Sequence, residues 1–240
     1  MATYLMRSVK RLTYGVAASL GFCGAACADG DVIDRVYDPY VRQLERELEY
    51  GALHQRDVGD KPAGLQWQRF SYGQAFSERW SGEVYAISHP GGNGIDAIEL
   101  EAKHQLTEQG EHDIDWGVLM ELERCFYCNS WEASTLLLAE RDWSRWVAVA
   151  NLALVYEWGR AIKSEFESRL AVQLRYRLSP LFEPALELYS GESTRALGPA
   201  LIGNVRLGQR RSLRWNAALL FGLDGATADT SAKLNVEYEF

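Results

Sequence analysis

The chain has 240 residues, of which 33 are acidic and 25 are basic, so its formal net charge at pH 7 is −8. This acidic balance argues against a nucleic acid as the partner, because nucleic-acid interfaces are strongly basic. Hydrophobic residues make up 47% of the chain, yet the mean hydropathy is slightly polar at −0.24. Such values argue against a bundle of membrane-spanning helices and are typical of strands that alternate polar and apolar residues.

Residues 1–28 predict a cleaved signal peptide, with a basic start, a short apolar stretch and a small-residue cleavage site. The apolar stretch is too short to cross a bilayer as a helix. A second interpretation makes Cys27 a lipidated N-terminus, although Gly24 stands where a lipid-attachment motif has a large aliphatic residue. Cleavage after Ala28 removes three basic residues and no acidic one, which leaves 22 basic against 33 acidic residues.

Residues 29–41 are polar and contain a proline, and they predict a periplasmic tail in front of the first strand. Twelve strand-like segments follow, at approximately 43–53, 65–77, 80–88, 95–106, 115–124, 131–141, 146–159, 165–178, 182–191, 197–208, 212–223 and 232–240. Turn signals rich in Gly, Pro, Asn, Asp and Ser separate them. We therefore expect one domain of short hairpins over residues 42–240.

Two consecutive segments, 146–159 and 165–178, alternate apolar and polar residues most clearly. In the second, one row reads Phe166, Ser168, Leu170, Val172, Leu174, Tyr176 and Leu178, and the other reads Glu167, Arg169, Ala171, Gln173, Arg175 and Arg177. A period of two indicates a strand with one apolar and one charged face. Both segments reach the roughly 9 to 11 residues of a tilted strand that crosses a bilayer, and their aromatic residues lie near the ends of the apolar rows.

The alternation is weaker in the first, second, third and sixth segments. Arg46 and Gln68 fall in apolar rows, whereas Leu136 and Leu138 fall in a polar row. A shift of one residue in register would exchange the two faces of a strand. The boundaries or the register of these segments are therefore the least certain part of the prediction.

The last segment decides what the apolar rows face. Leu234, Val236, Tyr238 and the terminal Phe240 form one row, so the chain stops on an aromatic residue at the end of an amphipathic strand. This ending resembles the insertion signature of bacterial outer-membrane barrels, which the barrel-insertion machinery reads. We therefore predict an all-β fold, a transmembrane antiparallel up-and-down β-barrel of about 12 strands in the bacterial outer membrane. An even strand count places both termini on the periplasmic side.

A family resemblance covers nearly the whole mature chain. The stretches ELEAKHQLTEQGE at 99–111, WGVLMELE at 116–123, LRYRLSPLFEPALELYSGEST at 174–194, LGP at 197–199 and VEYEF at 236–240 carry it. They resemble a group of uncharacterised proteobacterial outer-membrane barrel proteins and, more remotely, the porin-like barrels associated with phenol-degradation pathways. The resemblance implies an architecture and no established substrate.

The charged rows are the candidate functional feature. If the apolar rows face lipid, the first seven segments place an acidic surplus inside the barrel, opposed by Arg69 and Lys103, and the remaining segments place a mixed wall there. Such walls would order water and select small polar solutes by charge. The candidate selectivity residues are Arg169, Arg175, Arg177, Arg206, Arg214, Glu99, Glu101, Glu121, Glu123, Glu157, Glu183 and Glu187. Alternatively, these charges pair across strands and fill the lumen of so small a barrel.

Cysteine and histidine give weak signals of chemistry. Cys125 and Cys128 lie between two strands and predict a local disulfide in the oxidising exported compartment. Without a nearby histidine the pair is a poor metal site, so we expect no metal and no cofactor. His104 faces lipid by parity, as catalytic groups of barrel phospholipases do, but Ser168 lies four strands away. We therefore expect that the protein is not an enzyme.

The sequence thus favours a narrow passive channel for small polar or cationic solutes, with lipid, small solutes and the insertion machinery as partners. The alternatives are a structural or partner-binding barrel with a filled lumen and, less favoured, a barrel lipid hydrolase. The oligomeric state does not follow from the sequence.

Overall fold

A computed structural model describes residues 32–43, 46–56, 63–90, 94–160, 162–209 and 211–240. The predicted signal peptide and Cys27 lie outside the described residues. Twelve strands make up the fold: β1 (Arg46–Arg56), β2 (Gly64–Ala75), β3 (Trp80–Ser88), β4 (Ala97–Gln105), β5 (Asp115–Cys125), β6 (Ser130–Trp143), β7 (Trp146–Gly159), β8 (Glu165–Tyr176), β9 (Glu183–Ser190), β10 (Arg195–Arg206), β11 (Ser212–Gly222) and β12 (Thr230–Glu239). The described residues contain no helix long and apolar enough to cross a membrane.

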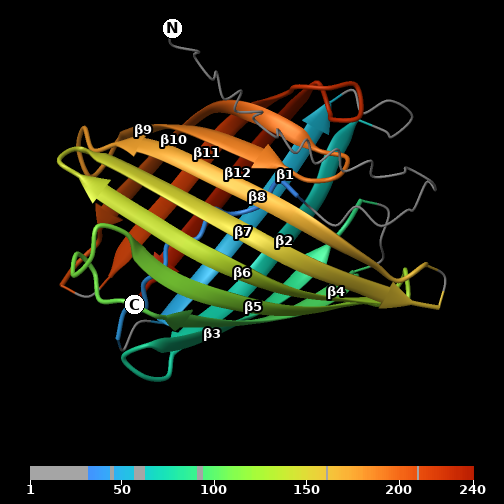
Figure 1. The fold of residues 1–240 in the computed structure, drawn as a ribbon, viewed down its shortest axis with the longest axis horizontal. Coiled ribbons are helices and arrows are strands. Elements are labelled where there is room, and N and C mark those ends of the chain that lie inside the picture. Colours follow the sequence, from blue (N-terminus) through green and yellow to red (C-terminus); the bar gives the residue numbers. More distant parts are fainter. Residues whose placement is uncertain (1–31, 44–45, 57–62, 91–93, 161, 210) are drawn as a thin grey trace, which may run out of the picture.

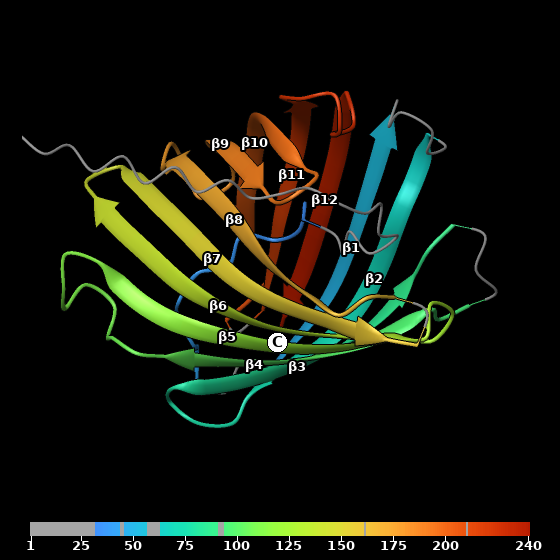
Figure 2. The same ribbon diagram turned by 45° about the vertical axis from the view of Figure 1, so that its right-hand side comes forward.

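The strands form one closed barrel in which each pairs antiparallel with its neighbours in sequence. β12 closes the ring by pairing with β1, from Glu47 opposite Glu239 to Arg56 opposite Thr230. The strands are tilted, so β5, β6 and β7 on the near wall run across the direction of β1, β11 and β12 on the far wall (Figures 1 and 2). The predicted twelve-stranded up-and-down barrel is confirmed, with strand ends displaced by a few residues. The first strand, predicted at 43–53, has the largest displacement.

The apolar rows face outward and the ionised rows face inward, as predicted. Large aliphatic side chains on the outer surface include Leu100, Leu152, Leu154, Leu186, Leu219 and Leu234, which are 41–59% exposed. Inward-facing charged side chains such as Glu49, Glu187 and Lys233 are at most 3% exposed. Soluble proteins have the opposite arrangement, with apolar side chains inside and most charged side chains at the surface. Apolar rows outside and ionised rows inside are the arrangement of barrels that lipid surrounds.

Aromatic side chains collect on the outer surface near both ends of the barrel. At one end Trp131 stacks on Trp158 with 6.3 Å between ring centroids, and Tyr156 packs on Phe166 at 4.5 Å. At the other end Trp146 meets Tyr176 edge to face at 5.0 Å. Two such belts, separated by aliphatic rows, mark the two levels at which a membrane barrel meets the lipid headgroups.

The C-terminus lies beside the start of the first strand, since the Phe240 amide donates to the Arg46 carbonyl at 2.9 Å. Tyr238 and Phe240 stack with ring centroids 5.6 Å apart, next to the outer surface. We call this end of the barrel, where β1 begins and β12 ends, the terminal end. The opposite end, which carries the β1–β2, β3–β4, β5–β6, β7–β8, β9–β10 and β11–β12 turns, is the distal end.

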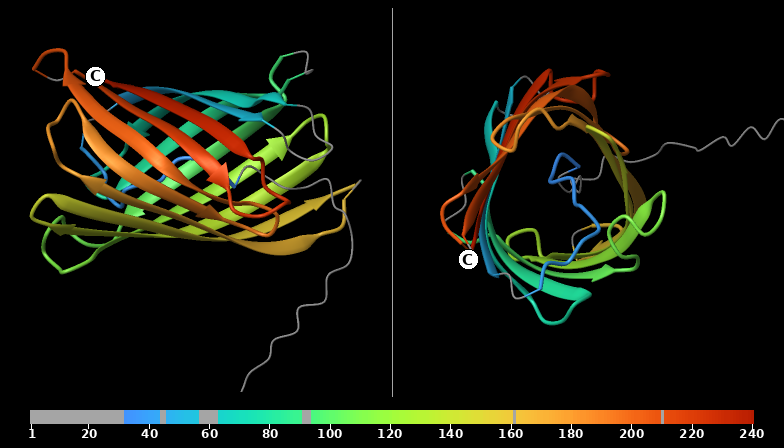
Figure 3. Two further views of the ribbon diagram at one scale, coloured as in Figure 1. Left: turned by 90° about the horizontal axis from the view of Figure 1, so that it is seen from above. Right: turned by 90° about the vertical axis from the view of Figure 1, so that its left-hand side faces the viewer.

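Residues 32–43 lie inside the barrel, although the sequence predicts residues 29–41 as a periplasmic tail. The right-hand view of Figure 3 looks into the barrel and shows this segment, in blue, within the ring of strands. Its side chains are largely buried, among them Ile33, Tyr37 and Tyr40. The physical reason is the inward face of the barrel, which carries apolar side chains and charges that this segment covers and pairs. We call residues 32–43 the luminal segment.

The outward rows lead to a prediction about Leu152, which lies near the middle of β7 and is 54% exposed. In lipid vesicles, Leu152→Arg is expected to lower the free energy of unfolding by about 2–4 kcal/mol, because it places a charge near the bilayer midplane. Urea titration followed by gel mobility of boiled and unboiled samples measures this. Leu178→Arg is the control, since Leu178 is equally exposed at 56% but lies in the β8–β9 turn. Equal losses in both variants would contradict the membrane-facing assignment.

Candidate functional site

The luminal segment is anchored near its middle by Asn151 of β7. The Asn151 side chain accepts a hydrogen bond from the Tyr37 amide at 2.7 Å and donates one to the Tyr37 carbonyl at 2.8 Å. Asn151 therefore satisfies both backbone groups of one residue, as a neighbouring strand would. The Tyr37 hydroxyl donates to the Glu101 carboxylate of β4 at 2.7 Å. Tyr37 thus links β7 to β4, three strands away in the ring.

Apolar packing also holds Tyr37 of the luminal segment in place. Tyr37 belongs to a buried cluster with Leu119, Leu136, Leu138, Ala153 and Val155. These residues face inward on β5, β6 and β7, which explains why the sixth segment has leucines in its polar row. A second buried cluster surrounds Val32 and Ile33 and includes Leu53, Trp67, Tyr85 and Leu220. The interior of the barrel is therefore partly apolar where the luminal segment covers it.

Arg35 and Asp34 join the luminal segment to charged residues of the wall. The Arg35 guanidinium pairs with Glu49 of β1 and, at 2.9 Å, with Glu237 of β12. Asp34 pairs with Arg69 of β2 at 2.6 Å. The Asp34 carbonyl accepts hydrogen bonds from Tyr189 at 2.7 Å and from Lys233 at 3.0 Å. Removing one partner of a buried pair leaves an uncompensated charge, so these contacts hold the segment firmly.

Asp38 and Tyr40 fix the segment near the terminal end. Burial alone would raise the pKa of Asp38, but the cations Arg42, Lys103 and Arg214 hold it well below its usual range. Asp38 lies 3.8 Å from both Lys103 and Arg214 and is therefore ionised. The Tyr40 hydroxyl donates to Asp115 at 2.8 Å. Gly117 of β5 makes room here, because a Cβ at that position would lie 3.0 Å from the Pro39 backbone.

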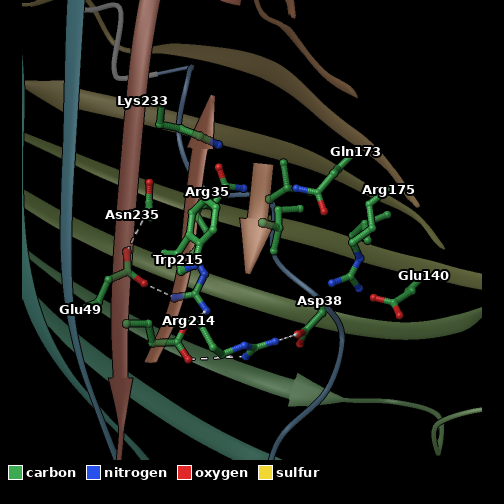
Figure 4. Close-up of a pocket in the computed structure, with 15 residues that line it drawn as sticks. Arg35, Asp38, Glu49, Glu140, Gln173, Arg175, Arg214, Trp215, Lys233 and Asn235 are labelled. Carbon is green, nitrogen blue, oxygen red and sulfur yellow. Dashed lines mark hydrogen bonds and ion pairs between the residues drawn. The ribbon is translucent and has the colours of Figure 1, made fainter. Parts of the chain in front are cut away.

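The cavities beside the luminal segment include two that charged side chains line. A cavity of about 90 Å³ lies between the luminal segment and the part of the wall that runs from β6 to β12. Arg35 and Asp38 of the segment face Glu140, Arg175 and Arg214 of the wall there (Figure 4). The second, of about 130 Å³, lies toward the distal end and is lined by Asp34, Trp67, Arg69, Ile87, His89, Glu99, Glu121, Glu123, Glu132 and Arg169. Both are polar enough to hold ordered water. Both are well below the roughly 300–1,000 Å³ of ordinary ligand pockets.

Three of the five predicted arginines lie within the lumen. Arg169 forms two hydrogen bonds of 2.9 Å with Glu132, Arg175 pairs with Glu183 at 3.5 Å, and Arg214 pairs with Glu239 at 3.2 Å and Glu237 at 3.5 Å. Arg177 follows the last residue of β8 and pairs with Asp142 at the rim of the terminal end. Arg206 is exposed at the last residue of β10. Two of the five predicted arginines, Arg177 and Arg206, therefore lie outside the lumen at the terminal end.

The predicted glutamates all belong to the inward rows. Glu187 is fully buried and receives hydrogen bonds from Lys233, Gln173 and Asn216 at 2.7–2.8 Å and from Tyr189 at 2.9 Å. Glu121 accepts a hydrogen bond from Ser134. Glu99 and Glu123 line the distal cavity. Cross-strand pairing brings Glu99, Glu123 and Glu157 into one row, in which Glu132 lies between Glu123 and Glu157.

Cys125 and Cys128 form a disulfide across the β5–β6 turn, with their Cα atoms 5.6 Å apart. His104 faces outward at the end of β4, where its ring stacks on Trp80 at 4.3 Å. One ring nitrogen of His104 lies 3.1 Å from the Arg79 carbonyl. Ser168 is on β8, four strands from β4. The structure therefore does not bring His104 and Ser168 together.

Sequence reasoning did not place the luminal segment inside the barrel. Asp34, Arg35, Tyr37 and Asp38 lie in a stretch without strand periodicity, and nothing in that stretch alone indicates burial. One signal was present in the strands, namely the inward apolar residues of β6, which need a partner inside the barrel. Asn151, the one amide in the inward row of β7, was the other signal.

The Asn151 contacts lead to a prediction about how firmly the segment is held. Asn151→Ala is expected to accelerate tryptic cleavage after Arg35 in the folded barrel by about fivefold or more, because loss of buried hydrogen bonds costs about 1–3 kcal/mol. Mass spectrometry of the released peptide measures the rate. Asn216→Ala is the control, since Asn216 donates to Glu187 of the wall. Unchanged cleavage in Asn151→Ala would show that Asn151 does not hold the segment.

No family model matches the chain, and no curated protein matches it in sequence. Solved structures match it in fold. The KdgM porin in complex with disordered oligogalacturonate superposes with a TM-score of 0.56 at 9% identity, over 81% of this chain and 99% of that one. The NanC porin gives 0.54 at 10% identity, over 80% and 98%. An outer-membrane channel from Pseudomonas putida F1 gives 0.55 at 12% identity, over 87% and 100%. The chain therefore has the fold of these outer-membrane porins and channels.

Proposed function

We propose that the protein is a narrow outer-membrane channel for small polar solutes, with its luminal segment as the constriction. The single observation that carries this proposal is the charged, cavity-containing lumen around residues 32–43. A barrel with a purely structural role has no need for the ionised side chains that face both cavities. Rings and walls of charge in a narrow pore select solutes by sign and by dipole.

The proposed permeants are small cations or small polar molecules. Carboxylates outnumber cations on β4 to β7, where Glu99, Glu101, Glu121 and Glu123 face inward near Lys103. An acidic surplus within a narrow lumen raises the local concentration of cations and repels anions. The mixed wall of β8 to β12 pairs most of its charges locally, so it adds polarity with little net charge.

The size of the cavities limits which solutes pass while the luminal segment stays in place. Cavities of about 90 and 130 Å³ admit water and small ions, but a sugar-sized solute requires a larger opening. Passage of such a solute needs displacement of the luminal segment. The KdgM structure holds an oligogalacturonate, and this chain would admit a comparable ligand only after that displacement.

Several finer predictions belong with this proposal. An outer-membrane channel is consistent with a signal peptide at residues 1–28 and a barrel domain at residues 42–240. It is also consistent with delivery through the barrel-insertion machinery and with a non-enzymatic role. The resemblance to uncharacterised proteobacterial barrels and to those of phenol-degradation pathways stays a prediction. The filled, partner-binding barrel is the competing function, because the luminal segment does occupy the lumen.

Planar-bilayer conductance of the refolded mature chain tests the proposal. We expect small, discrete conductance steps and a reversal potential in a KCl gradient that shows preference for K⁺ over Cl⁻. Deletion of residues 32–42 is expected to raise the conductance several-fold, because these residues lie within the lumen (Figure 3). Asn151→Ala, which loosens the segment without removing it, should increase the frequency of open events. Silence of all three proteins would favour the partner-binding barrel.

A charge variant tests which residues line the path. Arg175→Gln is expected to increase the preference for K⁺ over Cl⁻ by roughly fivefold, since a charge about 4 Å from a permeating ion contributes about 1 kcal/mol in water. Arg177→Gln serves as the matched control, because Arg177 lies two residues further along and outside β8. Equal effects of the two substitutions would place the path elsewhere than beside Arg175.

A further inference from the structure

Five glutamates form a continuous row across five adjacent strands. Glu99 of β4 lies opposite Glu123 of β5, which lies opposite Glu132 of β6. Glu132 in turn lies opposite Glu157 of β7, which lies opposite Glu165 at the start of β8. Residues opposite one another in antiparallel strands point to the same face, here the inward face. We call these five residues the glutamate row.

The row lies at the distal end of the barrel. Each of its members is within two residues of a strand end that carries a distal turn. With the termini in the periplasm, as the sequence predicts, the row faces the cell exterior. Glu167 of β8, two residues beyond Glu165, is on the same inward face, and it widens the row at that strand.

Like charges placed directly opposite one another destabilise a sheet. Arg169 offsets part of this repulsion, since its guanidinium binds Glu132 at 2.9 Å and Glu167 at 3.3 Å. Arg69 also lies beside the row, since it lines the distal cavity with Glu99, Glu123 and Glu132. Two guanidinium groups still carry less charge than the five carboxylates of the row and Glu167. A row of this kind is stable in its ionised form only with additional positive charge close by.

Two independent observations locate where that charge binds. Glu157, Glu165 and Glu167 each place a carboxylate oxygen within 4.8 Å of those of the other two. Glu157 is 9% exposed, and its Oε2 atom is buried without a hydrogen-bond partner. A buried carboxylate oxygen without a donor costs about 1–3 kcal/mol or more. The Glu157 Oε2 atom is therefore available to accept a further ligand.

We infer that Glu157, Glu165 and Glu167 bind a divalent cation, with Ca²⁺ as the best fit. Calcium takes oxygen ligands at about 2.3–2.6 Å, so two oxygens on one ion lie up to about 5 Å apart, and the three carboxylates meet that condition. Magnesium demands a stricter geometry and retains its water. Water molecules would complete the coordination shell of the ion.

Titration calorimetry with CaCl₂ tests this inference on the refolded mature barrel, in zwitterionic detergent with 0.15 M NaCl to screen non-specific attraction. We expect one site with a dissociation constant on the order of 10⁻⁴–10⁻³ M, as in exported calcium modules. Glu157→Gln should weaken binding by about tenfold or more, because it removes a charged ligand. Magnesium chloride should bind more weakly than calcium chloride.

Glu83→Gln is the matched control. Glu83 is an inward glutamate of similar exposure, 8%, that accepts a hydrogen bond from Ser71 and lies outside the glutamate row. It should leave calcium binding unchanged. Glu165→Gln, at the half-buried start of β8, provides a second test if Glu157→Gln does not refold by gel mobility. Absence of calcium binding in the unaltered barrel, or equal weakening by Glu83→Gln, would overturn the inference, whether or not the barrel conducts.

Discussion

The pairing of inward charges is the constraint on which the rest of the structure depends. A barrel that turns its leucines outward has only polar and ionised side chains left for much of its interior, and burial of an unpaired ion costs several kcal/mol. The wall supplies some partners, since Arg69 pairs with Glu49 and Arg214 pairs with Glu237, and the luminal segment adds a further cation. Glu49 and Glu237 of β1 and β12 both reach Arg35, which belongs to the luminal segment. The segment is therefore part of the interior of the fold.

The same segment also covers the apolar side chains of the lumen. Leu136 and Leu138 would be costly in a water-filled pore, because apolar surface in water is unfavourable by about 25 cal/mol per Å². The Tyr37 ring packs on these leucines, and its hydroxyl donates a hydrogen bond to Glu101. An amphipathic residue suits this place, since its ring packs on leucine while its hydroxyl reaches a carboxylate. One short stretch thus satisfies two chemically different regions of the wall.

The barrel could be predicted from the sequence because its cause is local. Each strand repeats a period of two, and rows such as Leu170 to Leu178 show it without a structure. The luminal segment could not be predicted, because its contacts join residues more than a hundred positions apart, as Tyr37 and Asn151 are. The glutamates were recognised as one acidic wall, but their alignment into a row depends on strand register. A shift of one residue between β6 and β7 would have moved Glu132 away from Glu157.

The luminal segment and the glutamate row meet at the distal cavity, which Asp34 lines together with Glu99, Glu123 and Glu132. Asp34 carries the same sign of charge as the row, so the row repels the segment at this point while Arg69 attracts it. A cation bound at the row would reduce that repulsion and favour the docked segment. By thermodynamic linkage, the docked segment would then strengthen cation binding by the same factor. On this proposal, closure of the lumen and cation binding at the row would be coupled through the charges around this cavity.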